Sequence, residues 1–239
     1  MSVISKLMTL GAAGVKKGPT EFGEAYGGGY YAGNINQGGV EYYIIVAPKS
    51  SGQSSSLQWY VSDRVSPAET VTVNNGAASS ASMNSASYPA AQFCEGRNIN
   101  GYTDWYLPAR DELEVCYRNL KPTTQANAVE SFARSFRSIT VNNPTSPGYP
   151  EFDDNSSDKF GRNRSSVPAG FTYTAGSPAQ TSVTIFQSGG SEAFDAARYW
   201  TSSRVFNYSV WYQDFYDGWQ GSGSAVTSFR VRAVRREPV

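Results

Sequence analysis

The stretch Gly101-Tyr-Thr-Asp-Trp-Tyr-Leu-Pro-Ala-Arg-Asp-Glu-Leu113 runs from a turn through a short extended piece into a helix. Beyond it, apolar side chains recur at i, i+3, i+4 and i+7, the spacing that places residues on one face of a helix. The residues are Leu113, Cys116, Tyr117 and Leu120. We therefore predict a helix over 110–120 with one buried face, ended by Lys121-Pro122.

Working outward from this helix, we predict a shorter one over 88–95, because proline is well tolerated in a first helical turn and Gly96 stops the segment. β-Branched and aromatic runs predict strands at 40–46 and 57–61, which we pair as one hairpin over 40–61. Alternation predicts a last strand at 229–235. Short helical pieces are expected near 131–136 and 182–186, and residues 140–180 form a long loop.

These elements divide the chain into three parts. Residues 1–30 are small and glycine-rich, and we interpret them as an N-terminal arm that becomes ordered against a partner, with a flexible leader as the alternative. Residues 31–80 form a β-rich attachment region. Residues 81–239 form the main domain, and its mixture of helices and strands predicts the α+β class.

Composition excludes several functions. Basic and acidic residues balance at 20 each, so no basic excess indicates nucleic-acid binding. The chain has no histidine, which removes the commonest general base and metal ligand at neutral pH. We expect no cofactor, no bound metal and no enzymatic activity. Cys94 and Cys116 fit either a disulfide or two buried thiols, and we favour thiols.

The first residues do not resemble an export signal. The apolar run near the start is broken by Ser5, Lys6 and Thr9, and Lys16-Lys17 follow the run instead of preceding it. No stretch approaches the ~20 apolar residues of a membrane span. We therefore expect a protein made in the cytoplasm that acts by assembly, without membrane insertion.

Three ordered blocks carry a family resemblance. The block 101–113 resembles the "G-x-x-D-W-x-L-P-x-x-x-E-L" motif of the DUF1566 family, also called the Lcl C-terminal domain. Tyr199-Trp-Thr-Ser-Ser203 followed by Val210-Trp-Tyr-Gln-Asp-Phe215, and then Arg230-Val-Arg-Ala-Val-Arg-Arg236, resemble that family's ending. The resemblance covers roughly 85–236. The upstream stretch Val46-Ala-Pro-Lys49 is similar to the sequences of phage members of the family.

The resemblance implies a C-type-lectin-like fold: two helices packed around twisted antiparallel strands with long loops. It implies structural roles for the motif residues Asp104, Trp105, Glu112, Trp200, Trp211, Arg230 and Arg232. From the residues themselves, we predict that the three tryptophans are core. We expect Asp104 to bond backbone amides, and Glu112 to be a structural partner of a last-strand arginine.

The candidate ligand-binding segment is 204–228. It is rich in Tyr, Ser, Gly and Asn, the mixture that binding loops use. Alternation suggests one buried row and one presented row, and the candidate contacts are Phe206, Tyr208, Tyr212, Tyr216 and Trp219. The alternative is that these aromatics fill a core that is poor in Leu and Ile. The acidic loop with Asp153, Asp154 and Asp158 lacks a calcium-loop pattern, and we interpret it as solvated.

Together these observations predict a bacteriophage virion protein, such as a tail fibre, baseplate or surface decoration component, which displays a lectin-like domain. The N-terminal region would contact other virion proteins, the displayed domain a host receptor or glycan, and family analogy suggests a homotrimer. The first alternative is a purely structural component without a ligand. The second is a tail-associated glycan hydrolase, for which no suitably spaced carboxylate pair is evident.

Overall fold

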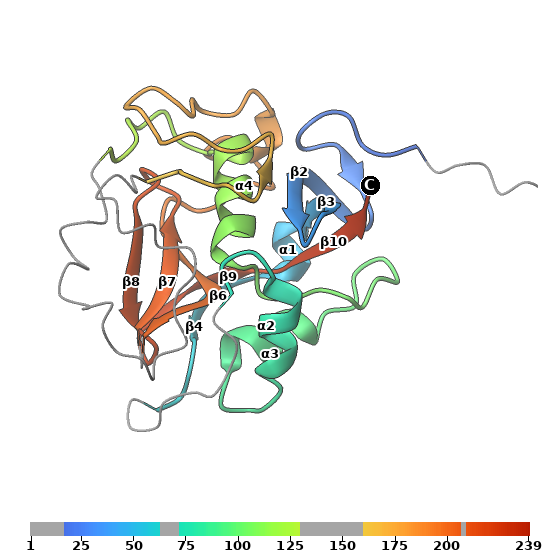
Figure 1. Ribbon diagram of the computed structural model, residues 1–239, viewed down its shortest axis with the longest axis vertical. Helices are drawn as coiled ribbons and strands as arrows, with labels where there is room; N and C mark the ends of the chain where they lie inside the picture. Colours follow the sequence, from blue (N-terminus) through green and yellow to red (C-terminus); the bar gives the residue numbers. More distant parts are fainter. Residues whose placement is uncertain (1–16, 63–71, 130–159, 207–208) are drawn as a thin grey trace, which may run out of the picture.

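The computed structural model describes residues 17–62, 72–129, 160–206 and 209–239, with only the backbone of Phe206. Within these ranges the chain has the α+β class that the sequence predicts, with few helices and two five-stranded sheets. Figure 1 shows helix α4 (Arg110–Leu120) standing between the two sheets, with two shorter helices below them. The long loops gather around the C-terminal end of α4.

The first sheet joins the two ends of the described chain. Its strand order is β1-β2-β3-β10, and β5 pairs with β2. The strands are β1 (Ala25–Tyr26), β2 (Gly29–Gln37), β3 (Val40–Val46), β5 (Ser166–Val167) and β10 (Val234–Pro238). Strands β2 and β3 form a hairpin through Gly38 and Gly39, whose positive φ angles of 59° and 86° suit the tight turn.

The second sheet has the order β4-β9-β6-β7-β8. Its strands are β4 (Gln53–Gln58), β6 (Arg198–Phe206), β7 (Ser209–Asp214), β8 (Gln220–Ser224) and β9 (Ser228–Arg232). All neighbours are antiparallel except β6 and β9. The predicted hairpin over 40–61 is therefore wrong, because β3 and β4 belong to different sheets.

The predicted last strand at 229–235 is two strands in different sheets. The chain changes sheet at Ala233, which is buried and exchanges backbone hydrogen bonds with the β3–β4 connection: its amide donates to Gly52 O and its carbonyl accepts from Ala47 N. These bonds satisfy the backbone at the crossing, so the two strands can remain continuous in sequence.

The helices largely match the predictions. Helix α4 confirms the helix predicted at 110–120, and α3 (Pro89–Glu95) confirms the one at 88–95. The short 3₁₀ helix η1 (Thr184–Phe186) lies within the piece predicted near 182–186, whereas the piece near 131–136 lies outside the described residues. The sequence did not predict α1 (Lys49–Gly52) or α2 (Gly76–Ser82).

The core is unusually aromatic. Trp105, Trp200 and Trp211 are each at most 1% exposed, which confirms their predicted core role. The indole N–H groups of Trp105 and Trp200 donate to backbone carbonyls, so these rings bury their apolar area without leaving those donors unpaired. Cys94 and Cys116 are buried free thiols, as favoured from the sequence.

The N-terminal strands are integral to both sheets. Strand β3 pairs with β10 from Val46↔Val234 to Tyr42↔Pro238, and β4 pairs with β9. Strands β2, β3 and β4, which lie in or begin just before the region 31–80 assigned to attachment, therefore share their hydrogen-bonded sheets with the C-terminal end of the chain. Residues 25–30, predicted to belong to the N-terminal arm, form β1, a turn and the start of β2 within the first sheet.

Candidate functional site

The three sequence blocks meet in one framework. Asp104 of the first block forms a two-pronged ion pair with Arg235 of the last, at 2.8 and 2.9 Å. Ser203 of the middle block accepts a hydrogen bond from the Arg110 amide, at 3.0 Å. The expectation that Asp104 bonds backbone amides is wrong, because a guanidinium offers its carboxylate two charge-assisted bonds at once.

Glu112 is fully buried and joins two helix N-termini. Its Oε2 accepts from the amides of Ala109 (2.8 Å) and Gly76 (3.2 Å), and its Oε1 accepts from the Tyr106 hydroxyl (3.1 Å). Burial raises the pKa of this carboxyl to about 7, against the lowering effect of these hydrogen bonds and of Arg236. Glu112 is thus structural, but it is hydrogen-bonded to two helix N-termini and to Tyr106, and the expected last-strand arginine acts on it only through its charge, from Arg236.

The arginines of β9 also have structural roles. Arg230 pairs with the half-exposed Asp195 at 2.9 Å. Arg232 is completely buried: it donates to the carbonyl of Ala47, and to both the carbonyl and the carboxylate of Glu192. A buried guanidinium is tolerated because these acceptors use all three of its nitrogens.

Of the row predicted to be presented in the 204–228 segment, the described residues Tyr212 and Trp219 are not exposed. Tyr212 is only 7% exposed and packs edge-on against Phe229 with Arg198 over its ring. Trp219 is half-buried and contacts Phe160 at a ring distance of 4.7 Å. Both aromatics therefore belong to the core, which is the alternative considered from the sequence. Tyr208 and the side chain of Phe206 lie outside what the structure describes.

Tyr216 remains as the exposed candidate. It occupies the turn between β7 and β8, and its side chain is 49% exposed. Its hydroxyl donates to the side chain of Gln125 at 3.1 Å, and its carbonyl accepts from the Thr123 hydroxyl at 2.6 Å. The turn is thereby tied to the segment that follows α4. We call the segments 121–128, 171–181 and 214–219 the loop surface.

Lys121, the residue after α4, is buried beneath the loop surface and joins two of its segments. Its side chain is 2% exposed, and its ammonium donates to Gln125 O (2.6 Å), Asn127 Oδ1 (2.7 Å) and Pro178 O (3.2 Å). All three acceptors are neutral oxygens, and burial lowers the pKa of the ammonium. The lysine therefore bridges two loops much as a bound cation would.

Asn127 completes this link. Its Oδ1 also accepts from the hydroxyl of Tyr117 on α4 at 2.7 Å, and its Nδ2 donates to the carbonyls of Thr174 and Pro178. The adjacent Ala128 amide donates to Asp217 O in the Tyr216 turn. One polar hub thus fixes three loops to the end of a helix. The sequence signal was Lys121 directly after the helix, which we interpreted only as the end of the helix.

Phe171 was also missed by the sequence analysis. It belongs to the loop surface, and its side chain is 84% exposed, the highest value among the large apolar residues that the structure describes. Its carbonyl accepts from Arg118 on α4, which holds the loop backbone.

The described residues also bear on metal binding and membrane insertion. Among the residues with a described position, no group of three or more His, Cys, Asp or Glu side chains is arranged to hold a metal ion. Asp153, Asp154 and Asp158 lie outside those residues. Within the same described part of the chain, none of the helices combines the length and apolarity needed to cross a membrane.

Comparison with known proteins identifies no relative: no family model, no curated protein and no solved structure matches this chain.

Proposed function

We propose that this chain is a bacteriophage virion protein whose C-terminal part is a C-type-lectin-like domain of the DUF1566 type. The observation that carries the proposal is the convergence of the three sequence blocks. Asp104 binds Arg235, Tyr106 bridges to Val234, and the Ser202 amide donates to Pro108 O. Blocks separated by about a hundred residues would converge in this way if they were the shared framework of one domain family.

The loop surface is the part of this domain that we assign to recognition. Its loops have little regular structure, yet Lys121 and Asn127 fix them to α4. A surface that is ordered before binding loses less conformational entropy when a partner arrives. Tyr216 offers ring area and a hydroxyl, the combination that recognition loops use. We assign the partner to a receptor or glycan on the host cell surface.

In the same proposal, the N-terminal region contacts other virion proteins, and the chain assembles as a homo-oligomer. The first sheet includes β1, β2 and β3, and Figure 1 places it on the opposite side of α4 from β7 and β8. Attachment through the N-terminal strands would leave the Tyr216 turn free. A purely structural role without a ligand is the outcome if the loop surface binds nothing.

The test is binding of the fluorescently labelled, purified chain to a panel of intact bacteria. We compare the wild type with Tyr216→Ala and with Phe22→Ala, a control of nearly equal exposure (46%) that stacks on Tyr31 of the first sheet. Saturable binding that is lost in Tyr216→Ala and kept in Phe22→Ala supports recognition by the loop surface. Absence of binding by the folded wild type contradicts the adhesive role.

A further inference from the structure

Two asparagine–glycine pairs occur in the chain, Asn75-Gly76 and Asn100-Gly101. Such a pair can react without an enzyme. The backbone nitrogen of the glycine attacks Cγ of the asparagine side chain, a C–N bond forms, and ammonia leaves. Water then opens the resulting succinimide ring at one of its two carbonyl groups, which gives aspartate or isoaspartate. Glycine favours the reaction because it has no side chain to hinder the attack.

The pair Asn100-Gly101 is open to solvent. It forms the two-residue turn between the bridged residues Ile99 and Tyr102, and its φ angles of 53° and 83° fit a turn of type I′. Both turn residues are exposed, and a Cβ on Gly101 would meet no atom within 4 Å beyond its chain neighbours. In the part of the chain that the structure describes, the Gly101 amide donates to no acceptor. The attacking nitrogen is therefore accessible to the side chain.

The Asn100 side chain is held by a weak contact. Its Nδ2 donates to Gly28 O, in the turn between β1 and β2, at 3.2 Å. Both partners are neutral and the asparagine is exposed, so water replaces this hydrogen bond at little cost when the side chain turns toward the Gly101 nitrogen. The local structure therefore lets both reacting groups come together.

The pair Asn75-Gly76 has the opposite surroundings. The Gly76 amide donates to Oε2 of the buried Glu112 at 3.2 Å, and Asn75 Oδ1 accepts from the Ala78 amide at 3.0 Å as the cap of α2. A Cβ on Gly76 would lie 2.3 Å from the same carboxylate oxygen. The attacking nitrogen must lose its proton, and a carboxylate beside it disfavours that loss because two negative charges would then be neighbours. Reaction at Asn75 would therefore break two hydrogen bonds in a crowded site.

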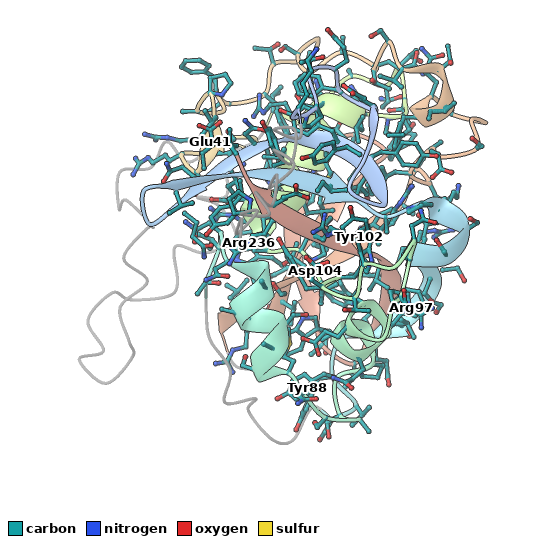
Figure 2. All side chains as sticks on the ribbon, turned by 90° about the vertical axis from the view of Figure 1, so that its right-hand side faces the viewer. Glu41, Tyr88, Arg97, Tyr102, Asp104 and Arg236 are labelled. Atoms are coloured by element: carbon teal, nitrogen blue, oxygen red, sulfur yellow. The ribbon has the colours of Figure 1, made fainter. Side chains whose placement is uncertain are left out.

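We infer that Asn100 is a site of spontaneous deamidation through a succinimide in the folded chain, and that Asn75 is protected from this reaction. An ionised aspartate at position 100 has no donor for the neighbouring turn, and isoaspartate adds a methylene group to the backbone just before Tyr102. Figure 2 shows Tyr102 and Asp104 close together on the face turned to the viewer. Asp104 binds Arg235, and the ring of Tyr102 covers that guanidinium at 4.2 Å. The modification therefore occurs next to the ion pair that joins the first and last sequence blocks.

The test is peptide mapping by mass spectrometry of the full chain, kept folded at pH 8 and sampled over time. Trypsin places the two asparagines in separate peptides, 65–97 and 98–110, and synthetic isoaspartyl peptides identify the products. We expect isoaspartate to accumulate at Asn100 at least about tenfold faster than at Asn75, a difference of about 1.4 kcal/mol in activation free energy. In urea, where both pairs are unfolded, the two rates should become nearly equal.

The control variant is Asn100→Gly, which keeps the turn because glycine adopts positive φ readily. It should abolish the isoaspartate signal of peptide 98–110, and a signal that persists would place the reaction at Asn98 and overturn the inference. Equal rates at Asn100 and Asn75 in the folded wild type would also overturn it. So would aspartate without isoaspartate at Asn100, because direct hydrolysis of the side-chain amide forms aspartate alone.

Discussion

Replacing Glu112 with glutamine should remove a pH dependence from the stability of the whole domain. The carboxylate accepts from two backbone amides through Oε2 and from the Tyr106 hydroxyl through Oε1. Glutamine has nearly the same shape. Its oxygen can take the place of Oε2, and its amide nitrogen can donate to the Tyr106 oxygen. The variant Glu112→Gln should therefore fold with α2 and α4 still joined, but without a titrating group.

The magnitude follows from the pKa. Burial raises the pKa of Glu112 from 4.5 to about 7, so the folded state favours the protonated form. The stabilisation that protonation provides is complete below about pH 4.5 and is lost as the pH rises through 7. With about 1.4 kcal/mol for each pKa unit, this one group lowers the free energy of unfolding by about 2.5 kcal/mol between roughly pH 5 and pH 8.

The assay is urea unfolding at a series of pH values, followed by tryptophan fluorescence. Other groups also titrate: burial raises the pKa of Glu114, and ion pairs with Lys49 and Arg230 lower that of Asp195. The informative quantity is therefore the difference between wild type and Glu112→Gln at each pH. If that difference stays constant from pH 5 to pH 8, the reasoning about the buried carboxyl is refuted.

Three further predictions concern other buried groups. Lys121→Met should lower the free energy of unfolding by about 2 kcal/mol in urea titrations, because three carbonyl-type acceptors lose their donor; an unchanged midpoint would contradict the hub. Arg232→Met should lower the free energy of unfolding by about 3–5 kcal/mol, because it leaves the carboxylate of Glu192 without its cation. Calorimetry should show a lower Tm, and an unchanged Tm would show that the pair is dispensable. Dithiothreitol should leave Tm unchanged, since Cys94 and Cys116 are free thiols; a lower Tm would indicate a disulfide.

The parts of the fold that sequence predicted are those determined by local pattern. Helix α4 has its apolar face at regular spacing, and both of its boundaries were placed correctly. Strand β3, with its β-branched and aromatic run, and helix α3, with its first-turn proline, are also indicated by local sequence alone. In these segments burial and intrinsic propensity favour the same structure, so tertiary contacts do not change the outcome.

Strand pairing could not be predicted in the same way. Pairing 40–46 with 57–61 was the simplest hairpin, but the Gly38-Gly39 turn pairs β3 with β2 instead. The sheet change at Ala233 coincides with a slip in the alternation, because Ala233 and Val234 are adjacent apolar residues. A slip of this kind also fits a β-bulge within one strand, so it did not identify a change of sheet. Helix α2 was missed because its Ser/Ala run has no apolar face. The helix is instead defined at its start by the side chain of Asn75, which caps it.

The candidate site was predicted only in part. Residue composition singled out the segment 204–228, but alternation could not show that both faces of β7 are covered. Trp211 packs toward α4, whereas Tyr212 packs against β9. Among the candidate contacts whose side chains the structure describes, Tyr216 alone is exposed. Lys121 was missed for a related reason: a lysine after a helix is ordinarily solvated, and its burial depends on loops distant in sequence.

The buried charges join parts of the chain that the two sheets do not hold together. Glu112 joins two helix starts, Arg232 joins the β3–β4 connection to the loop before β6, and Lys121 joins the loops around Tyr216. Each charge lies where chain segments meet without a shared sheet or helix, and each is compensated by directed hydrogen bonds that tolerate little displacement. Apolar contacts in the same places would be less specific about geometry. Substitutions at exposed positions between these hubs should therefore change the surface without changing the framework, as the proposed display of recognition loops requires.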